Sequence, residues 1–306
     1  MSTFRCHVIV LHWGDPSITA ACLASLRAEA DAQTRVLVVD NGTPDRSGDA
    51  LARDFPEFEH LRSEENLGFA GGNNLGLRRA LDEGAEFALL LNNDAEVKPG
   101  AIRALVAAAD ANPRLGFINP KILYHDPPGM IWYAGGTHSL WTGRAHHVGR
   151  GAMDRGQFDR PGPVSFVTGC ALLARGAMLE EIGLLDESLF MYAEDLDWGL
   201  RAQRAGWTLW HEPRAVVIHR DPVLKRKTVA DAFRLRLATR NTLRVNWRHG
   251  RPWQRATCAP WFMLRWAAFL TVKNLALGFP GDAWAVWRGV GDAIAGRTGR
   301  PEAERR

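Results

Sequence analysis

FALLLNND, residues 87–94, is a run of five apolar residues that stops at two asparagines and an aspartate. A short continuous apolar run bounded by turn-forming residues predicts a strand that is buried on both faces, as in a parallel sheet. In open sheets of this kind, ligands bind in the crevice beyond the carboxyl ends of the strands. The stretch therefore predicts both a central strand and a candidate binding site at its end.

The segments on either side of this strand alternate between strand and helix patterns. Helices are predicted from Pro16, from Ala70 and over 194–205, and hairpins over 129–150. Further strands are predicted at 7–11, 36–39, 58–62, 164–174, 208–211 and 215–219. This alternation predicts an α/β fold, with a Rossmann-like mixed sheet flanked by helices.

The C-terminal part of the chain has a different composition. From residue 220 to 306 there are 18 Lys and Arg against 6 Asp and Glu, a formal charge of +12, whereas the preceding 219 residues carry 20 and 28, or −8. Six of the twelve tryptophans follow Asn246, and helical patterns cover 229–248, 255–277 and 282–295. We therefore expect a catalytic unit at 1–222 and a basic, Trp-rich helical region at 223–306. Such a region binds an anionic membrane surface or nucleic acid, or is a solvated basic face.

The apolar segment 260–279 is about long enough to span a bilayer. However, Arg265 and Lys273 lie inside it, and each charge would cost ~2.5–3.5 kcal/mol at the membrane centre. We therefore expect an interfacial helix in the headgroup region. The alternatives are a helical subdomain packed on the catalytic unit and a dimer contact.

Composition excludes several classes of protein. With 46% hydrophobic and 24% charged residues, the chain is too apolar for a disordered protein. The four cysteines are scattered singly, which excludes a zinc knuckle or a redox pair and favours a reducing compartment. The N-terminal residues lack the pattern of a signal peptide, so we do not expect secretion.

Asn92 and Asp94 are candidate metal ligands. Oxygen donors two residues apart in a turn can face one divalent ion, and Mg²⁺ and Mn²⁺ prefer oxygen ligands. His219, at the end of the strand pattern AVVIH, is a candidate third ligand, and its imidazole suits Mn²⁺ better than Mg²⁺. The alternatives are an ordinary turn at 92–94 and a structural histidine.

Three carboxylates fall within four residues at Glu194, Asp195 and Asp197. They follow Phe190-Met191-Tyr192 and precede Trp198, so a pocket wall is one interpretation. Partial desolvation there would raise a carboxylate pKa toward that of a general base at neutral pH. The alternative is the acidic first turn of a helix, which needs no catalytic role.

A loop rich in glycine and asparagine opens the predicted helix at residue 70, within ENLGFAGGNN, residues 65–74. Free backbone N–H groups there could bind phosphate or sugar hydroxyls, although glycine could equally serve only a tight turn. The loop does not follow the first strand, so the dinucleotide fingerprint is absent and a nicotinamide dehydrogenase is not expected.

Five motifs in order, VVDNGTPD, ENLGFAGGNNLGL, LLLNNDAEV, VTGCALLAR and FMYAEDLDWGLRAQRAGW, resemble the inverting family 2 glycosyltransferases of GT-A fold. They look most like the branch of rhamnosyltransferases and galactofuranosyltransferases. The resemblance covers about residues 6–220.

The resemblance implies roles for individual residues. Asn92, Asp94 and His219 would bind Mn²⁺ or Mg²⁺, although an asparagine replaces the first Asp of the family's D-x-D motif. Asp195 would be the catalytic base, within the catalytic pair Glu194 and Asp195. The implied substrate-binding residues are Asp40, Asn66, Gly68, Gly72, Asn73, Asn93, Asp197 and Trp198.

The resemblance also implies a function. The expected reaction moves a sugar, first of all rhamnose, from a dTDP- or UDP-linked donor to a glycan or lipid-linked acceptor in bacterial polysaccharide synthesis. The expected location is cytoplasmic, on the inner face of the membrane, with an anionic membrane surface and no nucleic acid as partner. The alternatives are a noncatalytic nucleotide-sugar binder or scaffold in a glycan assembly complex, and a nucleotidyltransferase, which should carry a glycine-rich loop where Leu11–Asp15 has none.

Overall fold

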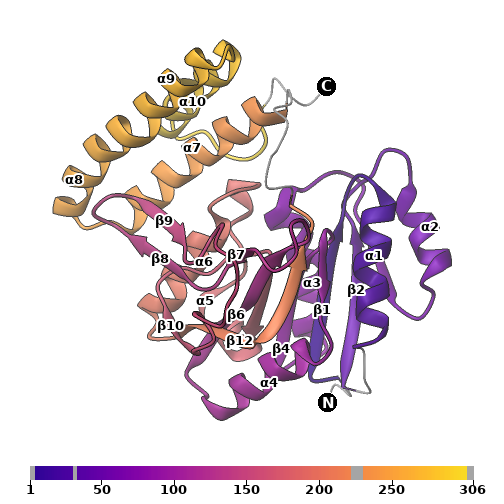
Figure 1. Ribbon diagram of the computed structural model, residues 1–306. Helices are drawn as coiled ribbons and strands as arrows, with labels where there is room; N and C mark the ends of the chain where they lie inside the picture. The colour runs from indigo at the N-terminus through magenta and orange to yellow at the C-terminus, as the bar shows by residue number, and fades with distance from the viewer. Residues whose placement is uncertain (1–3, 30–32, 222–229, 302–306) are drawn as a thin grey trace.

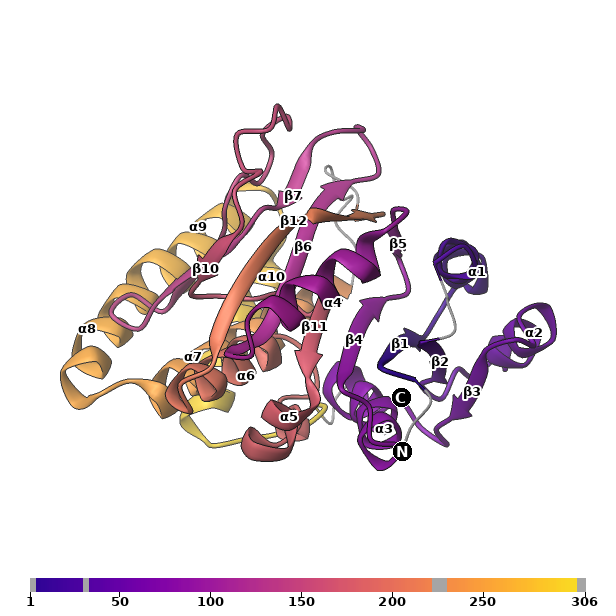
Figure 2. The same cartoon turned by 90° about the horizontal axis from the view of Figure 1, so that it is seen from below.

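The computed structural model describes residues 4–29, 33–221 and 230–301. Its centre is a mixed sheet with strand order β10-β12-β6-β11-β4-β1-β2-β3, with helices on both faces (Figures 1 and 2). The strands are β1 (Cys6–His12), β2 (Thr34–Asp40), β3 (Glu59–Arg62), β4 (Phe87–Asn92), β5 (Ala95–Val97), β6 (Leu115–Tyr124), β7 (Ile131–Tyr133), β10 (Gly162–Val164), β11 (Ala171–Arg175) and β12 (Thr208–His219). The predicted α/β fold is confirmed.

The sheet is parallel on the side of the N-terminal strands and mixed beyond β4. Strands β3, β2, β1 and β4 run parallel, whereas β11 runs antiparallel to both β4 and β6. Strand β12 is again parallel to β6. The carboxyl ends of β1, β2, β4, β6 and β12 therefore lie along one edge of the sheet.

Alternate side chains of the central strands pack into two cores. On β1, Val8 and Val10 belong to one buried cluster and Ile9 to the other, because successive side chains of a strand point to opposite faces. The first core is covered by α1 (Pro16–Arg27), α2 (Ser47–Asp54) and α4 (Ala101–Ala111), the second by α3 (Gly68–Asp82), α5 (Gly176–Ile182) and α6 (Glu194–Arg204).

Three of the predicted strands differ from the observed ones. The predicted strand 164–174 is divided between the end of β10 and most of β11. The loop between these two strands contains Gly169, which belongs to the functional site described below. Residues 208–219 form one strand, with a register shift between Glu212 and Val216. Pro213 lies in that shift, and because proline cannot donate a ladder hydrogen bond it is tolerated at such a bulge.

Residues 129–150 contain the predicted hairpin, formed by β8 (Gly136–Ser139) and β9 (Arg144–His147). Figure 1 shows this hairpin reaching from the sheet toward the C-terminal helices.

The C-terminal region consists of α7 (Ala230–His249), α8 (Pro252–Phe262), a π-helical segment (Met263–Ala268), α9 (Phe269–Ala276) and α10 (Pro280–Ile294). The predicted helix over 255–277 is thus interrupted. Pro260 lies just before the π-helical segment, and a proline inside a helix removes one backbone hydrogen bond. No helix within the described ranges combines the length and the apolarity that crossing a bilayer requires.

The expected boundary between residues 222 and 223 falls outside the described residues. Helix α7 is nevertheless tied closely to the catalytic unit. On α7, His249 Nε2 lies 2.8 Å from Asp197 Oδ1, and Arg248 Nη1 lies 2.7 Å from Asp186 Oδ2. These contacts hold α7, the first helix of the C-terminal region, against the catalytic unit.

Candidate active site

The ends of β4 and β12 meet at one corner of the sheet. Strand β12 pairs with β5 so that His219 lies opposite Ala95. This register brings His219 Nε2 to 3.1 Å from Asp94 Oδ1. The imidazole is buried, whereas 35% of the Asp94 side chain stays accessible. One ring nitrogen and one accessible carboxylate thus face each other.

The edge of Trp132 on β7 packs against His219, with ring centroids 4.6 Å apart. Burial opposes protonation of His219, but the Cys170 sulfur and the Asp94 carboxylate favour it, so the pKa of His219 is raised above its ordinary value. Its Nδ1 atom is buried without a hydrogen-bond partner. The surroundings of His219 therefore stabilise positive charge.

The two asparagines before Asp94 have different surroundings. The Asn93 amide donates to Thr19 Oγ1 on α1 at 2.9 Å, so this side chain is directed toward α1. Asn92 is half-buried, and its backbone N–H donates to the Cys170 carbonyl at 2.8 Å. Among the described residues, no three His, Cys, Asp or Glu side chains gather closely enough to hold a metal. The protein would thus supply few of the ligands of a bound metal ion, as is usual for Mg²⁺ bound together with substrate phosphates.

Asp195 lies in the first turn of α6, next to the same corner. Its Oδ2 accepts the Gly169 N–H at 3.1 Å, and its Oδ1 accepts the Leu196 N–H at 2.8 Å. Gly169 is followed directly by Cys170, whose carbonyl accepts the Asn92 N–H. One dipeptide therefore connects the carboxylate of Asp195 to the end of β4, the strand that Asp94 follows.

Glu194 differs from its neighbour in its hydrogen bonds. It is only 6% exposed, and its Oε2 has no partner. Burial raises the pKa of both carboxyl groups, and the Asp195 charge raises that of Glu194 further. Asp195 accepts the N–H groups of two other residues, Gly169 and Leu196, whereas the carboxyl of Glu194 accepts its own backbone N–H. We therefore assign the negative charge of the pair to Asp195 and the proton to Glu194.

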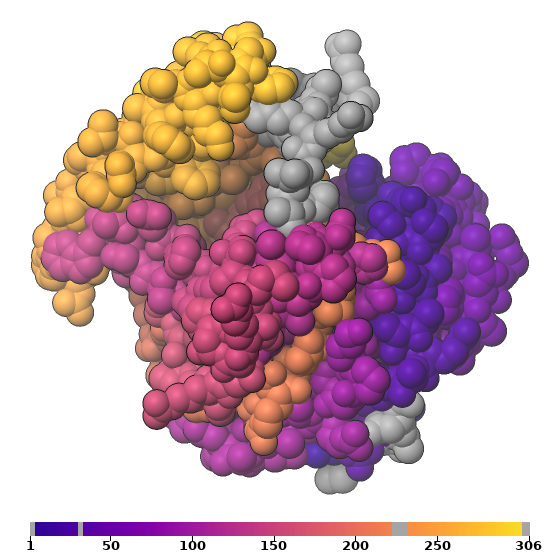
Figure 3. All heavy atoms as spheres, viewed as in Figure 1, coloured from indigo at the N-terminus to yellow at the C-terminus, as the bar shows by residue number. Residues whose placement is uncertain are grey.

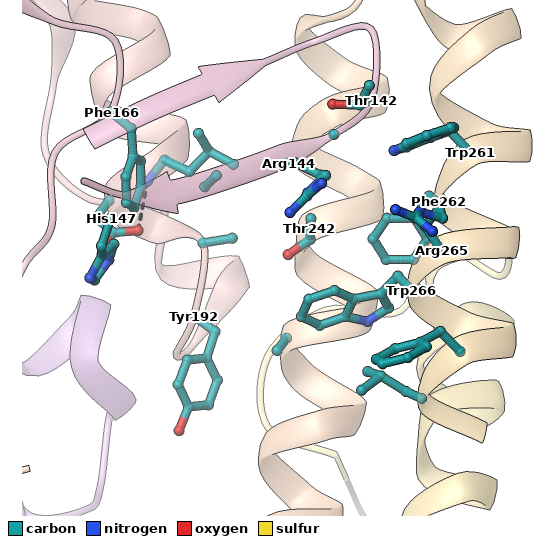
Figure 4. Close-up of a pocket in the computed structure, with 18 of the residues that line it drawn as sticks. Thr142, Arg144, His147, Phe166, Tyr192, Thr242, Trp261, Phe262, Arg265 and Trp266 are labelled. Atoms are coloured by element: carbon teal, nitrogen blue, oxygen red, sulfur yellow. Dashed lines mark hydrogen bonds between the residues drawn. The ribbon is translucent and has the colours of Figure 1, made fainter. Parts of the chain in front are cut away.

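Asp195 is one of the residues that line a cavity of about 690 Å³. Figure 4 shows the side chains of other lining residues. The cavity lies between β8–β9, α7 and the helices that follow it. Its lining includes Thr142, Arg144, His147, Arg150, Phe166, Tyr192, Asp195, Thr242, Trp261, Phe262, Arg265, Trp266, Phe269 and Leu270. His147 also contacts Trp132, with ring centroids 4.5 Å apart. Trp132 therefore connects one end of the cavity to His219.

Two buried asparagines that the sequence analysis missed hold this arrangement. The Asn119 amide on β6 donates to the carbonyls of Thr168 and Ala171, and its oxygen accepts the Thr168 N–H at 3.0 Å. These bonds shape the turn that presents the Gly169 N–H to Asp195. A lone asparagine inside the apolar strand pattern FINPKILY was the available signal, since a buried polar group must be paired.

Asn241 on α7 holds the loop before Glu194. Its amide lies within 2.9 Å of the carbonyls of Leu189, Met191 and Tyr192. That loop is strained, because Phe190, Tyr192 and Ala193 all have positive φ. A residue of the C-terminal region therefore supports the backbone that carries the candidate base, and no local pattern in the sequence indicates this.

Asp197 and Trp198 do not lie in the cavity. Both side chains are fully buried. Asp197 pairs with Arg201 and His249, which lower its pKa to about 2 although burial opposes ionisation. The Trp198 Nε1 donates to the Gly183 carbonyl at 2.9 Å. The expectation that these two residues contact a substrate therefore disagrees with their position, and both instead anchor α6.

The glycine and asparagine loop is bound to other parts of the protein. A Cβ on Gly68 would lie 2.3 Å from the Phe190 carbonyl, and one on Gly72 would lie 2.5 Å from Leu11 Cδ1. Asn66 Oδ1 accepts the Gly68 N–H at 2.8 Å, and the buried Asn73 amide donates to the Phe69 carbonyl at 2.9 Å. These contacts give all four residues a packing role.

Asp40 lies at the end of β2, buried at 5% exposure. Its Oδ1 accepts the Thr43 N–H at 3.0 Å, and its Oδ2 lies 2.6 Å from Arg62 Nη1. Its position beyond β2 is that of a ligand-binding residue in such sheets, and its oxygens retain lone pairs for a further donor.

A family model described as glycosyl transferase family 2 matches residues 7–183, more than half of the chain. The chain belongs to this family. It is a family 2 glycosyltransferase, as the sequence motifs predicted.

Two curated relatives from Mycobacterium tuberculosis are similar in sequence. N-acetylglucosaminyl-diphospho-decaprenol L-rhamnosyltransferase is 30% identical over 223 residues, which cover 64% of this chain and 70% of the relative. Galactofuranosyltransferase GlfT1 is 29% identical over 204 residues, covering 65% of this chain and 64% of the relative.

Solved glycosyltransferases share the fold. GalNAc-T7 with UDP, GalNAc and Mn²⁺ superposes with a TM-score of 0.61 at 14% identity, over 79% of this chain and 47% of that one. Mannosyltransferase PcManGT from Pyrobaculum calidifontis with GDP-Man and Mn²⁺ gives 0.59 at 15% identity, over 95% and 87%. The family 2 chain thus has the GT-A fold and spans about half the length of GalNAc-T7.

Proposed function

We propose that this chain transfers a sugar with inversion from a nucleotide diphosphate sugar to a lipid-linked glycan acceptor, in bacterial cell-surface polysaccharide synthesis. The observation that carries the proposal is the position of Asp195, which lines a cavity and is joined through Gly169 and Cys170 to the end of β4, the strand that leads to Asp94.

Asp94 and His219 would hold a divalent cation, Mn²⁺ or Mg²⁺, with Asn92 as a further oxygen ligand. Their donor set fits such an ion, because one accessible carboxylate oxygen and one imidazole nitrogen lie 3.1 Å apart, and the ion would displace the Nε2 proton of His219 that Asp94 stabilises. When bound, the ion would offset the charge that develops on the diphosphate leaving group.

Asp195 would act as the general base. It removes the proton from the acceptor hydroxyl while the acceptor oxygen bonds to the anomeric carbon. The bond from that carbon to the diphosphate oxygen breaks on the opposite face, and the nucleoside diphosphate leaves with the bonding electrons. Attack opposite to the leaving group inverts the anomeric configuration.

For the donor we propose deoxythymidine diphosphate rhamnose first, and a UDP-linked sugar second. The support is the 30% identity to a rhamnosyltransferase and the 29% identity to a galactofuranosyltransferase. Family membership disfavours the nucleotidyltransferase and scaffold alternatives.

A panel of nucleotide sugars tests the proposed donor in a thermal shift experiment. With Mn²⁺ present, the correct donor at ~100 times its Kd should raise the Tm by about 5 °C, because binding to the native state stabilises it by mass action. Without the ion the shift should be much smaller. If no nucleotide sugar in the panel changes the Tm, the proposed function is wrong.

We further propose that the enzyme works on the cytoplasmic side of a membrane, bound to its surface through α8–α10. Exposed apolar side chains recur along these helices every three to five residues: Trp261, Leu264, Phe269, Val272 and Leu275. Figure 3 shows that α8–α10 form one outer side of the molecule. Apolar residues beside basic ones favour the interface of an anionic bilayer.

Flotation with anionic liposomes tests this surface. Leu264→Glu/Val272→Glu should reduce the bound fraction at least tenfold, since each apolar side chain contributes ~1.5–3 kcal/mol when buried. Ile18→Glu on α1, also an exposed apolar residue, should float like the wild type. Equal flotation of all three proteins would contradict the proposal. Truncation after Asp221 is less suitable, because it also removes Asn241 and His249.

A further inference from the structure

The cavity that contains Asp195 has two walls that come from distant parts of the chain. One is the hairpin β8–β9, with Thr142 and Arg144, and the other is α8 with the π-helical segment, with Trp261 and Arg265. Figure 4 shows Arg144 and Arg265 pointing into the space between these walls, with Thr242 of α7 behind them. Figure 3 shows the same space as a hollow below the C-terminal helices.

Arg144 and Arg265 are cations without anionic partners. Both are exposed, and within the described part of the chain neither side chain forms a hydrogen bond or an ion pair. The Arg265 guanidinium only stacks over the Trp261 ring, at 5.3 Å from its centroid. The third arginine of the described lining, Arg150, instead lies 3.8 Å from the Asp221 carboxylate. Two free guanidinium groups in one cavity predict an anionic ligand, because their forked donors match phosphate oxygens.

The cavity carries an excess of positive charge. Its described lining includes one carboxylate, Asp195, and three arginines, of which Arg150 is paired with Asp221 and the other two have no anionic partner. Burial and the nearby Arg150 charge lower the pKa of His147 to about 4, so this histidine is neutral. Arg150 lies at the other end, where its guanidinium stacks on Trp132 at 5.6 Å, next to His219. Arg144 and Arg265 thus form a second cationic centre, separate from the corner of Asp94 and His219.

The same wall is apolar beyond the arginines. Trp266, Phe269 and Leu270 continue the lining, and Phe269 is also 60% exposed on the outer surface. The cavity therefore opens directly onto the exposed apolar residues of α9. A ligand that fills it can have an anionic group at the arginines and an apolar chain that leaves along Phe269.

We propose that Arg144 and Arg265 bind the phosphate groups of the lipid-linked acceptor. The acceptor's sugar lies toward Asp195, its phosphate groups between the two arginines, and its apolar chain along Trp266, Phe269 and Leu270. This inference rests on the proposed function, and it assigns the acceptor site to the β8–β9 hairpin and the C-terminal helices.

The binding of defined probes tests the site, and the fluorescence of the tryptophans that line it reports this binding. The probes are geranylgeranyl diphosphate below its micelle concentration, geranylgeraniol and inorganic pyrophosphate. The wild type should bind geranylgeranyl diphosphate at least tenfold more tightly than either other probe. Arg144→Gln/Arg265→Gln should weaken this binding at least tenfold, and Arg265→Lys should weaken it less, since it keeps the charge but loses the fork. Arg103→Gln should bind like the wild type, because this arginine is also exposed but belongs to α4, which lies at the opposite end of the molecule from α8 and α9 (Figure 1).

Three results would overturn the inference: equal binding of geranylgeraniol, equal binding of inorganic pyrophosphate, or unchanged affinity in the double arginine variant. Liposome flotation of that variant separates an acceptor site from general attraction to lipid headgroups. It should float like the wild type, and loss of flotation would assign the arginines to the bilayer instead. Donor binding with Mn²⁺, measured on the same samples, distinguishes the two proposals. If the donor binds and the isoprenoid diphosphate does not, only the acceptor site is wrong.

Discussion

Asp195→Asn should lower kcat by about 10³-fold while the protein keeps its fold and its affinity for the nucleotide sugar. The amide cannot accept the proton of the acceptor hydroxyl, and general base catalysis typically contributes 10²–10⁴-fold. Asparagine keeps the size of the side chain, and its oxygen can still accept one of the two backbone N–H bonds from Gly169 and Leu196. Initial rates, donor binding and the Tm, measured on one preparation, separate loss of chemistry from loss of folding.

Glu194→Gln is the matched control, because it changes the adjacent carboxyl in the same way. The buried Glu194 has no partner at Oε2 and a raised pKa, so it is protonated at neutral pH, and glutamine imitates that neutral form. We expect kcat within about tenfold of the wild type. Near-native turnover of Asp195→Asn, or a loss in Glu194→Gln as large as in Asp195→Asn, would show that the base is assigned wrongly.

The raised pKa values also predict the pH dependence. The general base must be ionised, so kcat/KM should fall as the pH decreases through the raised pKa of Asp195, above the usual range for an aspartate. The folded protein holds the Glu194 proton above the ordinary glutamate pKa of 4.5. The contribution of Glu194 to the free energy of unfolding should therefore decrease as the pH rises from there, and Glu194→Gln should lack this decrease.

Removal of the divalent ion should reduce activity by at least ~10²-fold, since a bound cation typically supplies several kcal/mol of charge stabilisation in such reactions. Addition of a chelator tests this, and Mn²⁺ in excess should restore the rate. Asp94→Asn should imitate the loss and respond less to added Mn²⁺, because it removes the only carboxylate of the Asn92, Asp94 and His219 set. The measurements are initial rates and Mn²⁺-dependent binding of the donor.

Asp110→Asn on α4 is the control for Asp94→Asn, because it removes an exposed carboxylate that pairs with Arg5. It should leave the response to Mn²⁺ unchanged. Full activity in the presence of chelator would exclude metal dependence. A normal Mn²⁺ response in Asp94→Asn would show that the ion binds at a site that does not include Asp94.

Local sequence patterns were sufficient for much of the fold. The run Phe87–Leu91 and the polar residues after it predicted both β4 and its place at the ligand-binding edge. Helix α6 shows where the sequence-based prediction of the site was too broad. It placed both Asp195 and Asp197 in the site, although side chains two positions apart in a helix point about 200° away from each other. Asp195 faces the cavity and Asp197 the interior, as that geometry requires.

The sequence by itself determined the α/β class, the family and the polar groups that follow the strands, because these depend on short-range periodicity and on motifs. Only the tertiary structure decided that Asn119 shapes the Gly169 turn, that Asn241 supports the loop before Glu194, and that Arg144 and Arg265 share one cavity. Each of these contacts joins segments about 50 residues or more apart. The two asparagine contacts arise from how buried polar groups find partners when the elements pack, whereas the two arginines share a cavity because the β8–β9 hairpin and the helices after α7 form its walls. No local pattern specifies either outcome.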